Sequence, residues 1–402
     1  MRQNAAVIEL THFEVSADRG FLPVRDPLAT FPGLQDSPLE ILTRELPKLL
    51  AARRLRDYVN SHLVSGPDEQ GRWNEDEYRA AARILSFTGQ AYVWEHPQHP
   101  AKKLPAHLAK PWHRVLAQLG RPPVLSYASY CLDNWRRLDQ TRPIELGNLS
   151  LLQNFLGGVD EEWFVLVHVE IEARAGAALA GLARALQATQ LNQSDEVLQG
   201  LEGAAAAMEG MCRTLDRMPE QCDPYIYFNR VRPYIHGWKD HPALPEGLLY
   251  EGVEAYGGKP QQFRGETGAQ SSIVPTLDAA LGVVHADDPL RQYLIEMRTY
   301  MPPRHRAFIE AWEQLRDRQG RSQLYRYALD RRQGEPRLWD RFRACVQGLC
   351  RFRQTHLDYA DRYIQRQSQR TSSNPTAVGT GGTPFMAYLK KHLDETAALI
   401  AE

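Results

Sequence analysis

The sequence has few cysteines, almost no net charge and no long apolar run, and each absence argues against a class of protein. Its 402 residues include five cysteines and no C-x-x-C pair, which argues against a zinc knuckle and against a secreted disulfide framework. The formal net charge of −1 argues against bulk nucleic acid or an anionic membrane as a partner. The apolar runs fall far short of the ~20 residues that span a bilayer.

Neither the N-terminal stretch nor the most arginine-rich stretch indicates secretion or nucleic-acid binding. The opening stretch MRQNAAVIELTHFEV lacks the basic and then apolar order of a secretory signal. With the cysteine usage, this predicts a reduced, cytoplasmic location. The arginine-rich stretch RYALDRRQGEPRLWDRFR is interleaved with Asp330, Glu335 and Asp340, so we interpret it as a solvated helix face and not as a nucleic-acid footprint.

The apolar periodicity predicts a mainly α protein, with few alternating β patterns and no internal repeat. We expect a smaller, mostly helical domain over residues 1–150 and a larger helical domain over 151–402. The clearest helical patterns cover residues 38–65 (with a break at Pro47), 75–96, 161–190, 194–217 and 337–367.

Two histidines lie on the apolar faces of long predicted helices. His356 shares the inward seam of 337–367 with Arg353, and His168 lies on the apolar face of 161–190. Such a histidine is most often a satisfied core residue, but it can also be a metal or haem ligand. A buried arginine needs a carboxylate partner, which a haem propionate would supply. Non-haem iron is less well supported, because the sequence has no H-E-x-x-H and its one Glu-x-x-His spacing lies at Glu9.

Two further stretches suggest recognition of a small molecule. In YFNRVRPYIHGW, Arg232 follows Tyr227 and Phe228 by one turn, which suits the carboxylate and ring of an aromatic amino acid. An exposed helix with a cation–π contact explains the same residues equally well. The glycine-rich stretch TAVGTGGTPFMAYL (376–389) fits neither nucleotide fingerprint, so from its residues alone its partner stays open.

Several longer stretches together match one family. They are VLSYASYCLDNW, WFVLVHVEIEARA, FNRVRPYIHGWKDHPALPEGLLYEG, GAQSSIVPTLDAALG, MRTYMPPRHRAF, FRQTHLDYADRYI and GTGGTPFMAYL, in family order from about residue 110 to the C-terminus. In these the chain resembles the indoleamine 2,3-dioxygenases, haem enzymes that open the indole ring of tryptophan. The first hundred residues match only loosely.

The resemblance implies a role for each matching residue. It implies a b-type haem, ferrous when active, with His356 as the proximal iron ligand, an Arg353–Asp278 ion pair at the haem edge, and Thr267 and Gly268 beside the haem. On the substrate side it implies that Arg232 binds the carboxylate. Phe164, Tyr227 and Gly268 are then expected to contact the indole ring, with Tyr127 deeper in the pocket. Thr380 is expected to belong to a mobile loop at about 371–384 that closes over the substrate.

Three positions depart from the family pattern. His168 replaces a small hydroxyl residue of mammalian members and is expected to accept the indole N–H or to narrow the pocket. Tyr227 replaces a phenylalanine, and Glu266 interrupts a more glycine-rich stretch near the haem rim. These departures leave the substrate less defined than the reaction class.

The resemblance also implies the activity and its partners. The expected reaction is cleavage of the indole C2–C3 bond of L-tryptophan by O₂ to N-formylkynurenine, the first step of the kynurenine pathway. An electron donor keeps the iron ferrous, and we expect a monomer without nucleic-acid or membrane partners. The alternatives are a haem oxygenase acting on a different or substituted indole, and a non-catalytic haem-binding homologue.

Overall fold

The computed structural model describes residues 8–31, 37–63, 73–369, 380 and 385–401, and these residues confirm the mainly α class. The predicted loop at 371–384 lies outside the described residues, except for Thr380. The α-helices are α1 (Pro38–Ala51), α2 (Leu55–His62), α3 (Glu75–Trp94), α4 (Ala106–Gln118), α5 (Val159–Gln190), α6 (Ser194–Asp216), α7 (Pro224–Ile226), α8 (Ile273–Leu281), α9 (Pro289–Met297), α10 (Pro303–Gln314), α11 (Gln323–Asp330), α12 (Pro336–Ala360), α13 (Arg366–Ser368) and α14 (Phe385–Ala398).

Short turns and strands connect these helices. The 3₁₀ turns are η1 (Leu10–Phe13), η3 (Met218–Glu220), η5 (Arg232–Tyr234), η6 (Glu254–Tyr256), η7 (Gly268–Gln270) and η8 (Arg298–Tyr300), and the π-helical turns are η2 (Ala128–Leu132), η4 (Tyr227–Val231) and η9 (Asp361–Gln365). The strands are β1 (Lys103–Leu104), β2 (Trp135–Arg137), β3 (Leu149–Leu151) and β4 (Leu249–Tyr250). Strand β1 pairs with β4 in parallel, and β2 pairs with β3 antiparallel.

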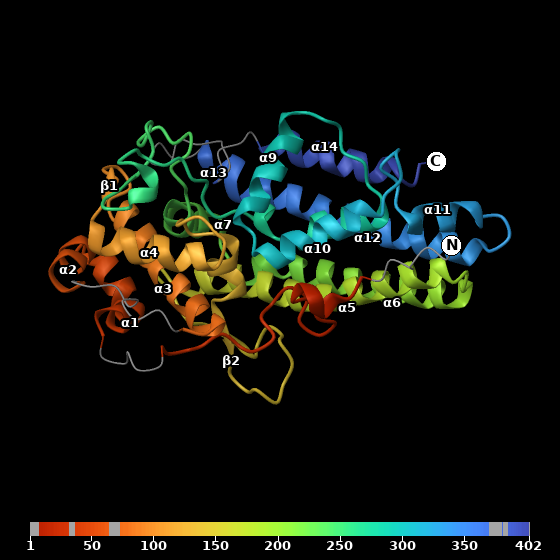
Figure 1. Cartoon of the computed structure of the whole chain (residues 1–402), viewed down its shortest axis with the longest axis horizontal. Helices are drawn as coiled ribbons and strands as arrows, with labels where there is room; N and C mark the ends of the chain where they lie inside the picture. Colours follow the sequence, from red (N-terminus) through yellow and green to blue (C-terminus); the bar gives the residue numbers. More distant parts are fainter. Residues whose placement is uncertain (1–7, 32–36, 64–72, 370–379, 381–384, 402) are drawn as a thin grey trace.

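Helices α5, α6 and α12 form the long core of the molecule and run side by side along its long axis (Figure 1). Helix α5 is buried on nearly all sides. A Cβ added at Gly181 would lie 2.6 Å from the carbonyl oxygen of Gly200, so these two glycines let α5 and α6 approach closely. The predicted helices over 161–190 and 194–217 are confirmed.

Two predicted helices differ from expectation, one at an internal proline and one at its C-terminal end. The break at Pro47 is wrong, because α1 continues through it to Ala51 while Leu42, Leu46 and Leu50 remain buried. A proline removes only its own N–H donor, and this apolar face compensates for the loss. The predicted helix 337–367 is regular to Ala360 and then widens into the π-helical turn η9 before the short α13.

The N-terminal and C-terminal parts share one hydrophobic core. Buried apolar side chains from Val15 in the N-terminal segment to Leu399 after α14 belong to a single cluster. The predicted division into two domains near residue 150 is therefore not visible in the core and stays a prediction. Across the described ranges, no helix combines the length and apolar character needed to cross a membrane.

Candidate functional site

A cavity of about 320 Å³ lies between α5, α8, α12 and α14. Nine of the predicted site residues line it: Phe164, His168, Tyr227, Thr267, Gly268, Asp278, Arg353, His356 and Thr380. They come from segments that are far apart in the sequence, so tertiary packing brings them together. A Cβ added at Gly268 would meet open space, which agrees with its position on the cavity wall.

His356 and His168 both project into this cavity, one from α12 and the other from α5. The side chain of His356 is exposed because its ring faces the cavity, and protein surrounds the cavity itself. Burial lowers the pKa of His356 to about 4, and repulsion from His168 and Arg353 adds to the shift. The imidazole is therefore neutral at pH 7, as a metal ligand must be.

His168 presents one defined nitrogen to the cavity. Its Nδ1 lies 2.7 Å from the carbonyl oxygen of Phe164, one helical turn earlier. A carbonyl only accepts, so Nδ1 carries the proton and donates, and Nε2 keeps its lone pair. Burial lowers the pKa of His168, which favours this neutral form. The side chain is therefore a hydrogen-bond acceptor in the cavity.

Aromatic rings form one wall of the cavity. The Phe164 and Tyr227 centroids are 4.7 Å apart at 38°, and the Tyr227 and Tyr363 centroids are 5.8 Å apart in an edge-to-face arrangement. The His168 ring lies 4.7 Å from Phe164. Such a wall suits a flat aromatic ligand.

Arg353 and Asp278, which the resemblance places at the haem edge, form an ion pair in the structure. Arg353 Nη2 donates to Asp278 Oδ2 at 2.7 Å, and Nη1 donates to the Thr396 hydroxyl of α14. Although Asp278 is buried, attraction to Arg353 and His285 holds the pKa of its carboxyl well below the usual range. The carboxylate partner that a buried arginine requires is therefore a protein side chain.

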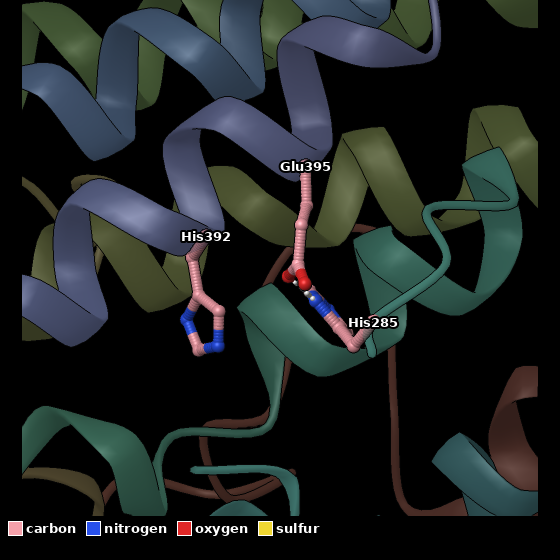
Figure 2. Close-up of side chains that lie close together, drawn as sticks. All are labelled: His285, His392 and Glu395. Atoms are coloured by element: carbon pink, nitrogen blue, oxygen red, sulfur yellow. Dashed lines mark hydrogen bonds and ion pairs between the residues drawn. The ribbon is translucent and has the colours of Figure 1, made fainter. Parts of the chain in front are cut away.

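A second polar cluster consists of His285, His392 and Glu395 (Figure 2), and His285 connects it to Asp278. His285 Nδ1 lies 2.6 Å from Glu395 Oε2, and its Nε2 lies 3.1 Å from Asp278 Oδ2. His285, His392 and Glu395 offer ligand atoms within 4.8 Å of one another, a spacing that a metal ion also requires. Both nitrogens of His285 already contact carboxylate oxygens, so the cluster is explained as an ion-pair network that joins the end of α8 to α14.

The segment 263–272 builds the opposite side of the cavity. Gly237 and Gly265 allow two backbones to touch, because a Cβ added at Gly265 would lie 2.2 Å from the backbone nitrogen of Gly237. Next to this contact, the Glu266 N–H donates to the Ile235 carbonyl at 3.0 Å. The Gln270 side chain donates to the Gly265 carbonyl at 2.9 Å and accepts from the Tyr127 N–H at 2.9 Å.

Two predicted substrate residues lie behind the cavity wall. Arg232 is fully buried, with Nη1 3.1 Å from His236 Nε2 and its guanidinium 5.4 Å from the Phe228 ring centre. This burial contradicts the exposed-helix interpretation of Arg232, although the cation–π contact is present. Burial also lowers the pKa of Arg232 to about 10. The Tyr127 hydroxyl donates to Glu172 Oε1 at 2.9 Å, behind His168.

Sequence reasoning missed several residues at the site. Glu266 was expected only near the haem rim, but it lines the cavity and is 3% exposed. Tyr363 shares the inward seam of His356, and that spacing was the available signal for it. Glu172, which accepts hydrogen bonds from Tyr127 and Ser271, follows His168 by four residues on the same helix. His285 and His392 carried no sequence signal.

Comparisons with known proteins agree with this geometry. A family model described as Indoleamine 2,3-dioxygenase matches residues 9–399. Indoleamine 2,3-dioxygenase 2 of Homo sapiens is 32% identical over 98% of this chain and 96% of its own length. Indoleamine 2,3-dioxygenase 1 of Rattus norvegicus is 33% identical over 96% and 94%, and indoleamine 2,3-dioxygenase acdA of Aspergillus candidus is 32% identical over 97% of each chain. With a family match over nearly its whole length, this chain belongs to the indoleamine 2,3-dioxygenases, a haem-dependent family, and is a dioxygenase.

Proposed function

We propose that this chain binds a b-type haem through His356 and cleaves the indole C2–C3 bond of L-tryptophan with O₂ to give N-formylkynurenine. One observation carries the proposal: a neutral His356 and a neutral His168 project into one cavity that has an aromatic wall. The first histidine suits a metal and the second suits an N–H donor.

The chemistry of the cavity fits a haem. The neutral imidazole of His356 is accessible from the cavity, and apolar side chains such as Phe352, Ala360 and Ile364 from the same helical region share the wall. Thr267 supplies a hydroxyl there, and the Arg353–Asp278 pair supplies a buried charge close to His356. A ferrous haem held there supplies the activation of O₂, both atoms of which enter the product.

The remaining residues would bind and orient the substrate. Phe164 and Tyr227 would hold the plane of the indole ring, and His168 Nε2 would accept the indole N–H. Packing of the rings would also exclude water from the reacting carbons.

Arg232 and Thr380 would recognise the amino-acid end. Thr380 lines the cavity, and its hydroxyl donates to the Glu266 carbonyl at 2.5 Å. Arg232 lies behind the wall beside Tyr227, so a carboxylate clamp would require its guanidinium to turn toward the cavity. An arginine can then form two parallel hydrogen bonds with the carboxylate.

Product analysis tests the proposal directly. We expect the haem-loaded, reduced protein to convert L-tryptophan in aerated buffer into a product that carries two added oxygen atoms, detected by mass spectrometry. Haem binding without this product would overturn L-tryptophan as the substrate, and a panel of substituted indoles would then identify another. Absence of turnover with every indole would indicate a non-catalytic haem-binding homologue.

A further inference from the structure

Glu266 differs from the other acidic side chains on the cavity wall. Among the described residues, three carboxyl groups line the cavity: Glu266, Asp278 and Glu313. Asp278 pairs with Arg353 at 2.7 Å, and Glu313 pairs with Arg298 at 2.6 Å. Within the part of the chain that the structure describes, Glu266 forms no ion pair, although it is 3% exposed. A buried carboxylate without a cation is costly, so this group keeps its proton until a cationic group enters the cavity.

Two backbone hydrogen bonds fix the position of Glu266 in the cavity wall. Its N–H donates to Ile235, and its carbonyl accepts the Thr380 hydroxyl at 2.5 Å. Its carboxyl also lies close enough to Tyr227 to influence that phenol. Glu266 is thus placed between the aromatic wall and Thr380.

We propose that the Glu266 carboxylate binds the α-ammonium group of an indole amino acid. This inference rests on the proposed function and adds a specificity determinant to it: the site selects indoles that carry an amine. With Arg232 on the carboxylate, Glu266 would complete the recognition of a zwitterion. Charge-assisted hydrogen bonds of this type are among the stronger ones in proteins.

The protonation of Glu266 provides a distinct signature. Burial raises the pKa of Glu266 to about 8, and no charge in the described residues contributes to the shift. The titratable groups that sense Glu266 are Tyr127, Tyr130, Cys131 and Tyr227, all of which burial keeps neutral. At pH 7 Glu266 is therefore mostly protonated. An ammonium ion stabilises the carboxylate, so binding should release close to one proton.

Anaerobic calorimetry on the haem-loaded full chain tests this inference. L-tryptophan and indole-3-propanoate, which lacks the amine, are titrated into wild type, Glu266→Gln and Glu161→Gln in two buffers of different ionisation enthalpy. Glu161→Gln is the matched control, because burial also raises the pKa of Glu161, to about 7, but its carboxylate accepts the Phe155 and Gly157 N–H groups and does not line the cavity. We expect Glu266→Gln to weaken L-tryptophan binding about 10- to 100-fold, to abolish its proton release and to leave indole-3-propanoate binding unchanged.

The other outcomes separate this inference from the proposed function. Equal weakening of both ligands by Glu266→Gln, or the same selective loss in Glu161→Gln, would overturn the role of Glu266 while tryptophan turnover stands. A loss of haem in Glu266→Gln with an unchanged ratio of ligand affinities would assign the carboxyl to the cofactor and also overturn it. The expected selectivity in a wild-type protein that forms no ring-opened product would support Glu266 and refute the reaction. Failure of L-tryptophan to bind wild type would refute both.

Discussion

The two sides of the cavity differ in how their buried ionisable groups are stabilised. On the side formed by α8, α12 and α14, Arg353, Asp278, His285 and Glu395 are linked by ion pairs. On the side formed by α5, η4 and residues 263–272, burial raises the pKa of Glu266 to about 8 and that of Glu172 to about 7. On the first side the protein supplies the ion-pair partners of these charged groups, whereas on the second side Glu266 has no ion-pair partner among the described residues.

The same contrast appears in the backbone. The first side rests largely on regular helices, which place side chains at fixed intervals and tie α12 to α14. The second side includes the π-helical turn η4, the short turn η7 and the glycine contact between residues 237 and 265. Irregular backbone allows side chains from several segments to converge on one ligand. We therefore expect the cofactor on the side of His356 and substrate recognition mainly on the side of His168.

The largest expected effect is loss of the cofactor in His356→Ala. Without the imidazole, haem would lose its protein ligand, so we expect little haem absorbance per protein and no activity, with partial recovery when imidazole is added. His168→Ala is the matched control from the opposite side and should retain haem. Equal haem content in the two variants would refute the assignment of the sides.

Asp278→Asn tests the ion-paired side. The substitution leaves Arg353 buried without its carboxylate, so we expect the free energy of unfolding to fall by about 3–5 kcal/mol. Urea unfolding measures this. Asp394→Asn, which removes the exposed pair with Lys390, should cost less than about 1 kcal/mol. Similar losses in the two variants would contradict the structural role of the buried pair.

Arg232→Ala tests carboxylate recognition on the substrate side. We expect L-tryptophan binding to weaken by about 2–5 kcal/mol, whereas tryptamine, which has no carboxylate, should bind as before. Because Arg232 is fully buried, the comparison of the two ligands separates recognition from a general loss of stability. Equal losses would remove Arg232 from the carboxylate contact.

His168→Ser tests the smaller contribution of one neutral hydrogen bond. Wild type should discriminate against 1-methyltryptophan, which has no indole N–H, and the variant should relax this preference by about 1 kcal/mol, or roughly fivefold. Specificity constants for the two substrates measure the change. The same ratio in both proteins would show that His168 does not contact the indole nitrogen.

The smallest expected effect is the pH dependence of the His285 network. Burial disfavours the imidazolium, but attraction to Asp278 and the hydrogen bonds to Asp278 and Glu395 raise the pKa of His285, while nearby Arg353 opposes this rise. Its contribution to stability is therefore complete below the ordinary histidine pKa of about 6.5 and is lost as the pH rises through the higher folded value. Unfolding of wild type and His285→Gln across this range should converge at high pH, and a constant difference would contradict the ionic role.

Predictions from the sequence succeeded where a single helix carries the signal. Helical periodicity located α5, α6 and α12 and placed His168, Arg353 and His356 on inward faces. The inward position of Arg353 required a carboxylate partner, and in the structure Asp278 supplies it. The pattern was less informative at Pro47, where one apolar face preserved the helix, and at Arg232, whose burial depends on segments distant in the chain.

By itself, the sequence determined the helical class, the family and the residues that face inward, because these depend on local periodicity and on contiguous motifs. Only the tertiary structure decided which charges are paired. Glu266 and Asp278 are both buried acids on the cavity wall, but Arg353 lies beside one and no cation from the described residues beside the other. Electrostatic environment depends on distance in space, and α8, α12 and residues 263–272 meet only when the chain is folded.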